Sequence, residues 1–193
     1  MATAKIYDAD LNPTKDEVAA TYSKIQKVDG SYRAVDPANV VGIEVVVGKD
    51  PDDNLAQLGL SYRPADQALD TELLRMQHSE LGERSVAYLT DDAVAVREII
   101  RMIITGGHGA DFDNGEPIFD VYGNGRTPDA TVGDVEIEES NGWTSLGTAT
   151  IDGESHQFQL RLQKTIQEQS TEADELALVK DGNATLMRLE VWR

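Results

Sequence analysis

The chain has no cysteine. This absence excludes disulfides, zinc–thiolate sites, iron–sulfur clusters and cysteine nucleophiles. Long apolar runs are also lacking, since no stretch approaches the roughly 20 residues that a membrane-spanning helix needs. Residues 1–11 carry acids and no apolar run, so we expect no signal peptide. These absences predict a cytoplasmic protein.

Positive charge is scarce, because 17 Lys and Arg face 35 Asp and Glu among 193 residues, for a net charge of −18. Nucleic acids and anionic membranes repel such a chain, so we expect neither as a partner. The excess is concentrated between Asp91 and Ser140, where 12 acids accompany 3 bases. Either these acids keep the protein soluble, or the segment binds a basic partner or a cation.

The first part of the chain predicts one short helix, one hairpin and two further strands. Thr14 and Glu17 have capping-box spacing, which indicates a helix from about residue 14 to 27, ended near Gly30. Alternation over 41–47 predicts a strand with one buried face, and it resumes over 58–62 after a turn at 49–54. Two further strands are expected at 74–78 and 86–88.

A second helix begins near Thr90 or Asp91. Its apolar stripe, which includes Ile100, is broad enough to predict a helix largely covered by sheet, and Gly106 and Gly107 end it. We therefore expect Ile100 to lie in the core.

Short strands alone are expected after residue 107, at 118–122, at 135–138 and in two hairpins. The first hairpin joins 143–151 to 156–163 through Asp152-Gly153, and the second turns at Asp181-Gly182. The polar stretch 163–176 fits either a loop or a short helix. The pattern predicts an α+β fold in a single domain, residues 1–193, with a helix-and-sheet part at 1–107 and a mostly β part at 108–193.

No motif supplies a catalytic or metal site. The run His108 to Asp113 resembles fragments of a kinase site, but its acids are two residues apart and no glycine-rich nucleotide loop precedes them. The acids near Asp111 do not fit the spacing of a calcium loop, and no two histidines are placed as a metal pair. Trp143 and Trp192 are expected to be packing residues. The sequence predicts no enzyme, no metal and no cofactor.

Three runs carry a family resemblance. They are Val-Gly-Ile-Glu at 41–44, Leu-Ser-Tyr-Arg at 60–63 and His-Ser-Glu-Leu-Gly-Glu-Arg-Ser-Val at 78–86. This part of the chain resembles the N-terminal cap domain of bacterial maltokinases, and still more the small free-standing cap-like proteins of actinobacteria. The resemblance covers about residues 5–107, and the later strands agree only in their order.

The resemblance implies a fold and a metabolic context. The fold is a helix held against a curved antiparallel sheet, cystatin-like in this first part, and the context is maltose, trehalose and glycogen metabolism. In maltokinases phosphoryl transfer belongs to kinase lobes beyond the cap, and we expect none here because the chain ends at Arg193.

Two hypotheses for the function follow. The leading one is a non-enzymatic cap-like protein that binds or regulates a partner, such as a kinase-type enzyme of α-glucan metabolism. The alternative is a small-ligand carrier, whose concave sheet face holds a sugar or another polar metabolite. A deep pocket with convergent polar groups favours the carrier, and a flat apolar patch or a bare sheet edge favours the partner.

A candidate docking surface comprises Tyr62, Arg63, His78 and Arg84. By period-two alternation Tyr62 should face the core and Arg63 the opposite way. We expect His78 to be largely buried and hydrogen-bonded, and Arg84 to be partly exposed. The two arginines either pair with carboxylates at the surface or form a planar anion-binding or docking surface.

Overall fold

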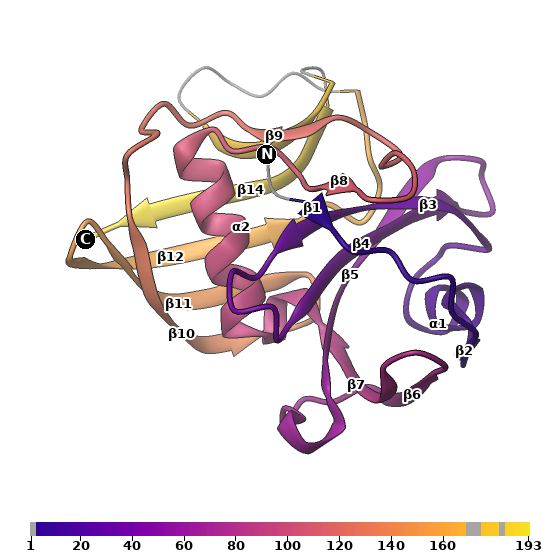
Figure 1. The fold of residues 1–193 in the computed structure, drawn as a ribbon. Coiled ribbons are helices and arrows are strands. Elements are labelled where there is room, and N and C mark those ends of the chain that lie inside the picture. Colours follow the sequence, from indigo (N-terminus) through magenta and orange to yellow (C-terminus); the bar gives the residue numbers. More distant parts are fainter. Residues whose placement is uncertain (1–2, 169–174, 182–183) are drawn as a thin grey trace.

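The computed structural model describes residues 3–168, 175–181 and 184–193. These residues form two six-stranded antiparallel sheets, a two-stranded parallel pair and two α-helices, so the predicted α+β class is confirmed (Figure 1). The parallel pair joins β1 (Thr3–Ala4) to β8 (Asp111–Phe112). Neither α-helix among the described residues is long and apolar enough to cross a membrane.

The first sheet has the strand order β2-β6-β7-β5-β4-β3. Its strands are β2 (Leu11–Asn12), β3 (Lys27–Val35), β4 (Gly42–Lys49), β5 (Leu55–Pro64), β6 (Leu74–His78) and β7 (Gly82–Tyr88). The predicted hairpin β4–β5 is confirmed, and the strands predicted at 74–78 and 86–88 are also present and pair with each other as β6 and β7. A 3-10 turn, η1 (Ala65–Gln67), follows β5.

The second sheet has the strand order β10-β11-β12-β14-β13-β9. Its strands are β9 (Val121–Gly123), β10 (Val132–Ser140), β11 (Thr144–Ile151), β12 (Glu154–Leu162), β13 (Leu176–Lys180) and β14 (Ala184–Trp192). Asp152 and Gly153 have φ values of 51° and 82°, which confirms the predicted tight turn between β11 and β12. Gly182, in the other predicted turn, lies outside the described residues.

Helix α1 (Lys15–Tyr22) has the predicted capping box but is shorter than predicted. Thr14 Oγ1 accepts from the Glu17 N–H, and Glu17 Oε2 accepts from the Thr14 N–H at 2.8 Å. The helix ends at Ser23 because Lys27 already pairs with Lys49 of β4. Gly30 therefore lies within β3 instead of ending the helix, and pairing with the sheet overrides the local helical pattern.

Strand β4 is covered on both faces, which corrects the prediction of one buried face. Ile43, Val45 and Val47 pack in the larger core cluster around α2 (Ala93–Thr105). Val46 points the other way, into a second cluster that includes Val18 of α1. A strand between two apolar layers has few polar positions, so its sequence cannot show strict alternation.

Helix α2 lies between the two sheets and is the centre of the larger core (Figure 1). Its N-cap is Asp92 and not Thr90 or Asp91, because residues Leu89–Asp91 first form the 3-10 turn η2. The carboxylate of Asp92 accepts from the N–H groups of Val94 and Ala95. Gly106 ends the helix at φ 69°, and Ile100 is fully buried, both as predicted.

Strand β10 forms one edge of the second sheet. Val135 and Ile137 pack against the larger core, while Asp134, Glu136, Glu138 and Glu139 are exposed. The register against β11 shifts twice, between Val132 and Val135 and between Ile137 and Glu139. The edge is therefore irregular, bulged and acidic.

Candidate functional site

The structure places the four residues of the predicted docking surface on two faces of the first sheet. In the first sheet Tyr62 lies opposite Val86, and Arg84 lies opposite Met76. Because side chains alternate along a strand, Tyr62, His78 and Arg84 share the face that carries α1, while Arg63 points to the other face. Three of the four predicted residues therefore lie on one face.

Tyr62 contributes to a buried charged network on that face. Its hydroxyl donates to Glu44 Oε2 at 3.1 Å, and Glu44 Oε1 lies 2.7 Å from Lys15 Nζ and 3.0 Å from Arg33 Nη2. Burial raises the pKa of Glu44, but Arg33, Lys15 and the hydrogen bonds outweigh burial and lower the pKa to about 2. Tyr62 faces inward, as predicted, and its hydroxyl is already bonded.

His78 is partly exposed, which corrects the prediction that it is largely buried. It is the last residue of β6, and its Nδ1 accepts from the N–H groups of Glu80 and Leu81, both at 3.2 Å. The ring of Tyr7 packs edge-on against the imidazole at 5.4 Å. The side chain thus holds the β6–β7 turn, and partial burial followed by the charge of Arg84 lowers its pKa.

Arg63 makes a buried ion pair and not a surface one. Its Nε and Nη2 each lie 2.7 Å from an oxygen of Asp92, whose side chain is fully buried. The same carboxylate caps α2. Arg63 therefore fixes the start of the central helix, and this bonding leaves its guanidinium turned away from solvent on the face opposite Tyr62.

Arg84 has no carboxylate partner among the described residues, contrary to the prediction of a surface pair. Its Nη2 donates to the carbonyls of Tyr62 at 3.2 Å and Val40 at 3.4 Å. Partial burial lowers its pKa. The carbonyls at the end of β5 are closer to the side chain than any acid, because Arg84 pairs with Pro64 at that end.

A different site lies where the two sheets meet. Residues 163–166 leave β12 and cross to β5, where Ile166 N donates to Leu55 O at 2.7 Å and Gln57 N donates to Lys164 O. The fully buried amide of Gln57 donates to the carbonyls of Gln163 and Leu186 and accepts from the Tyr32 hydroxyl. This bonding fixes the crossing segment, which was predicted as a loop or a short helix; residues 169–174 lie outside the described residues.

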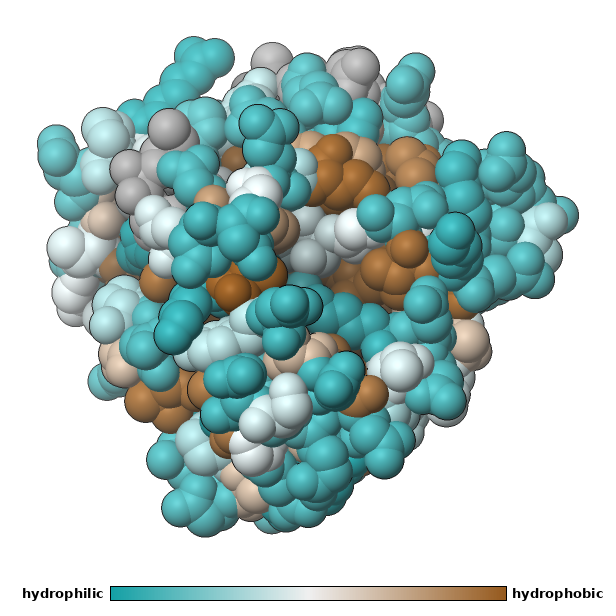
Figure 2. Space-filling view, turned by 45° about the vertical axis from the view of Figure 1, so that its right-hand side comes forward, coloured by the Kyte–Doolittle hydropathy of each residue, from teal (hydrophilic) through white to brown (hydrophobic). Residues whose placement is uncertain are grey.

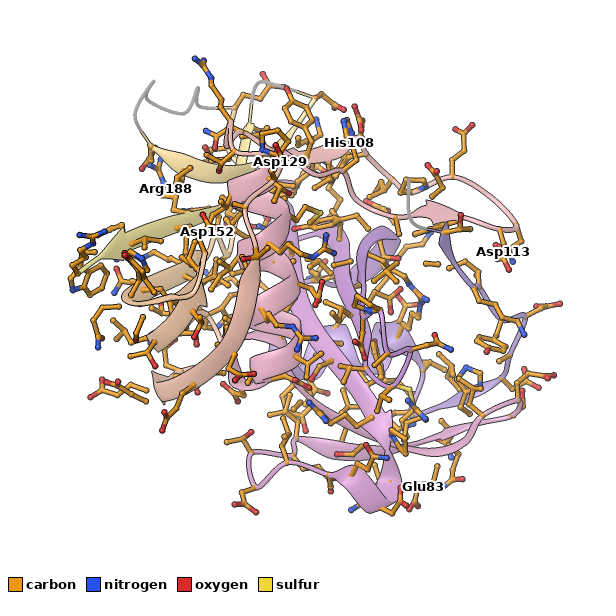
Figure 3. The ribbon with its side chains drawn as sticks, turned by 60° about the vertical axis from the view of Figure 1, so that its left-hand side comes forward. Glu83, His108, Asp113, Asp129, Asp152 and Arg188 are labelled. Carbon is orange, nitrogen blue, oxygen red and sulfur yellow. The ribbon has the colours of Figure 1, made fainter. Side chains whose placement is uncertain are left out.

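The crossing segment borders an open pocket of about 680 Å³. Polar side chains predominate in the lining, which comprises Asn141, Trp143, Thr144, Arg161, Leu162, Gln163, Lys164, Thr165, Gln167, Thr185 and Arg188. Three of these residues are cationic and none is acidic. Figure 3 shows Arg188 on β14 far from Glu83, the neighbour of Arg84 on β7.

Trp143 forms the aromatic part of the pocket. Its ring is partly buried, packs against both core clusters and lies 6.4 Å from the ring of Tyr88. Lys164 Nζ lies 5.0 Å from the centre of the Trp143 ring. The predicted packing role is therefore only part of what this residue does, since its remaining surface lines the pocket.

The cations of the pocket are held in different ways. Arg161 Nη2 donates to the neutral Oε1 of Gln159 at 2.8 Å, whereas Arg188 pairs with Glu175. Arg161 and Arg188 lie directly opposite each other on β12 and β14. Sequence reasoning missed this pair because residues 27 positions apart become neighbours only through the strand order.

The run from His108 to Asp113 is dispersed in the structure. Asp113 Oδ1 accepts from Ile6 N at 2.8 Å, and His108 Nδ1 lies 3.4 Å from Asp120 Oδ1. Figure 3 shows Asp113 well apart from His108 and Asp129, so the acidic segment 91–140 does not gather all three residues. Among the described residues no group of three His, Cys, Asp or Glu could hold a metal ion.

Comparisons with protein-family models, with curated proteins and with solved structures found no match for this chain.

Proposed function

We propose that this chain is a non-enzymatic binding protein that holds a small polar ligand in the pocket between its second sheet and the crossing segment. The observation that carries the proposal is the pocket itself, where amide, hydroxyl and cationic groups converge beside Trp143. Small-ligand sites are concave, combine an aromatic or apolar wall with a few polar groups, and occur where structural units meet. The ligand-carrier alternative thereby becomes the leading hypothesis.

The two tryptophans allow a direct test. In a Trp192→Phe variant, Trp143 is the only tryptophan, so its fluorescence reports on the pocket. The probes are maltose, trehalose, glucose, glucose 6-phosphate and glucuronate, chosen from the α-glucan context that the resemblance implies. We expect at least one probe to change the emission with a saturable curve at concentrations up to about 10 mM, the range of weak specific binding.

The matched control is Trp143→Phe, which keeps Trp192 on the exposed end of β14. It should show no saturable change with the same probe. If no probe changes the emission of Trp143, and none raises the melting temperature of the unmodified protein, the ligand-binding proposal is wrong.

A partner-binding role remains the second candidate. Leu81 is 43% exposed at the tip of the β6–β7 hairpin, beside the turn that His78 holds, and Arg84 lies near it without a carboxylate partner among the described residues. On the face drawn in Figure 2, however, apolar residues form separate patches between polar side chains. The acidic, bulged edge of β10 is also poorly suited to pairing with a strand of another protein. Ligand binding in the pocket is therefore favoured over partner binding.

The partner candidate is testable with a purified maltokinase-type enzyme as the probe. Binding would be measured by biolayer interferometry, and Leu81→Ser should weaken it at least about fivefold, a loss of roughly 1 kcal/mol. Arg126→Gln, a change at an exposed cation elsewhere, serves as the control. Equal binding by all variants, or none by the unmodified protein, contradicts this role.

The proposal includes the finer features that the resemblance implies. These are a cystatin-like first part, a link to maltose, trehalose and glycogen metabolism, and a cytoplasmic location, for which the lack of cysteine is the support. It also includes the absence of kinase activity: with ATP and maltose, purified protein should form no ADP above the blank. Turnover abolished by Asp111→Asn would contradict it.

A further inference from the structure

The charge of the pocket is opposite to that of the whole chain. The net charge is −18, yet Arg161, Lys164 and Arg188 line one pocket, and no Asp or Glu among the described residues does. In so acidic a protein, a random set of lining residues would carry more acids than bases. The local sign therefore distinguishes this pocket from the rest of the surface.

The placement of the two arginines does not serve the stability of the sheet. Like charges directly opposite each other on neighbouring antiparallel strands are destabilising. Glu175 pairs with Arg188, but Arg161 is bonded only to the neutral amide of Gln159 among the described residues. Among the described residues, the guanidinium of Arg161 at the pocket wall therefore has no carboxylate to balance its charge, and an anion between the strands would relieve the repulsion.

The third cation lies beside the aromatic wall. Lys164 Nζ is 5.0 Å from the centre of the Trp143 ring and has no carboxylate partner among the described residues. A ligand that carries both a ring and an anionic group can contact Trp143 with the ring while its anion lies near Arg161 and Lys164. Neutral sugars lack the group that the arginine forks recognise best, which is an oxyanion.

We infer that the pocket binds a small ring-containing oxyanion, a carboxylate or a phosphate ester, with Arg161 and Lys164 as its anchoring cations. This inference rests on the proposed ligand-binding function and adds the chemical class of the ligand. Arg188 supports the anion from the neighbouring strand while it remains paired with Glu175. Gln163, Gln167 and Thr165 supply neutral hydrogen-bonding groups for the remainder of the ligand.

The test compares three probes that share one ring: glucose, glucose 6-phosphate and glucuronate. Trp143 fluorescence in the Trp192→Phe background should show that an anionic probe binds at least about fivefold more tightly than glucose, a difference of roughly 1 kcal/mol. The affinity should fall as salt is raised from 50 to 300 mM, because exposed charges are screened. The anion that binds more tightly shows whether the pocket prefers a phosphate ester or a carboxylate.

Variants separate specific recognition from general attraction. Arg161 makes no ion pair with the described residues, so Arg161→Gln removes charge without breaking such a pair. This substitution should lower the affinity for the anionic probe at least about fivefold, and Lys164→Gln should also lower it. Arg126→Gln removes the same charge from an exposed site outside the pocket and should leave affinity unchanged. Circular dichroism melts would verify that all three variants remain folded.

The outcomes separate the two proposals. If glucose binds as tightly as its anionic derivatives, or if Arg161→Gln and Lys164→Gln leave anion binding intact, the anion inference is overturned while the ligand-binding function stands. If none of these probes nor maltose nor trehalose binds, the function itself fails.

Discussion

The Arg63–Asp92 pair joins the first sheet to the start of α2. Asp92 is fully buried, accepts two hydrogen bonds from Arg63 and also caps the helix with two more. Removing Arg63 would leave a buried carboxylate without its counter-charge. The pair is therefore structural, and the docking reading of Arg63 is disfavoured.

We predict that Arg63→Gln lowers the free energy of unfolding by about 3–5 kcal/mol, the usual effect of removing one partner of a buried ion pair. Urea melts followed by circular dichroism would measure it. Arg126→Gln is the matched control and should change stability by less than about 0.5 kcal/mol. A loss below about 1 kcal/mol for Arg63→Gln would show that the pair is not structural.

Glu44 gives the protein a specific sensitivity to acid. Its folded-state pKa is about 2, against an ordinary value of 4.5, because Arg33 and Lys15 outweigh the effect of burial. The unfolded chain therefore binds this proton more tightly than the folded protein does. The stabilising contribution is complete above about pH 4.5 and is lost as the pH falls from 4.5 toward 2.

We predict that Glu44→Gln reduces the acid dependence of stability by an amount on the order of 3 kcal/mol between pH 4.5 and 2. Other acids with lowered pKa, such as Asp36, act in the same range, so the difference between the two proteins is the quantity to compare. Urea melts at several pH values in this window would measure it. Parallel stability curves for the two proteins would contradict the assignment.

Strand alternation predicted the inward direction of Tyr62, and the acidic composition predicted a carboxylate partner for Arg63, although at the surface. They could not identify which carboxylate, because Asp92 is 29 positions away and reaches Arg63 only through the packing of α2 on β5. His78 followed the strand alternation in sequence, yet its place at the last residue of β6 turned the ring toward the following loop. In both cases the position in the tertiary structure determined the contacts of the side chain.

At the scale of elements, α2 is the part of the molecule on which both sheets depend. Its side chains Val96, Ile99, Ile100 and Ile103 are all buried in the larger core cluster. The sequence predicted this helix well because its broad apolar stripe has an unambiguous period, and because Gly106 is required for the left-handed end.

We predict that Ile100→Ala costs about 2–5 kcal/mol of stability through lost burial and the cavity that it leaves. Val94, half-exposed on the same helix, is the matched position, and Val94→Ala should cost about 1 kcal/mol or less. Chemical denaturation would compare the two. A cost for Ile100→Ala below roughly 0.5 kcal/mol would mean that α2 is peripheral.

Element boundaries were predicted less well than element types. Residues 23–27 continue the helical pattern of α1 in sequence, but their partner is the far end of β4. The Ser23 side chain also accepts from Ile25 N, which turns the chain toward β3. Local pattern and long-range pairing disagreed here, and pairing decided the boundary.

At the scale of the whole molecule, local hairpins were predictable and the order of strands was not. Turn residues such as Asp152 and Gly153 indicate which neighbours pair. Nothing local indicates that β12 pairs with β14, or that β9 joins β13. The pocket lies between distant segments that this strand order brings together, so it was also beyond the reach of sequence reasoning.

The acidic edge strand has a consequence for how the protein behaves at high concentration. Exposed strand edges template the stacking of one molecule on the next, and bulges with dense like charge oppose that stacking. We predict that Glu136→Val with Glu138→Val raises light scattering on concentration, whereas Glu190→Val, at an exposed position on the interior strand β14, does not. Unchanged scattering would contradict this role. If the scattering rises as predicted, part of the large negative charge of the protein acts as a kinetic barrier against fibre growth.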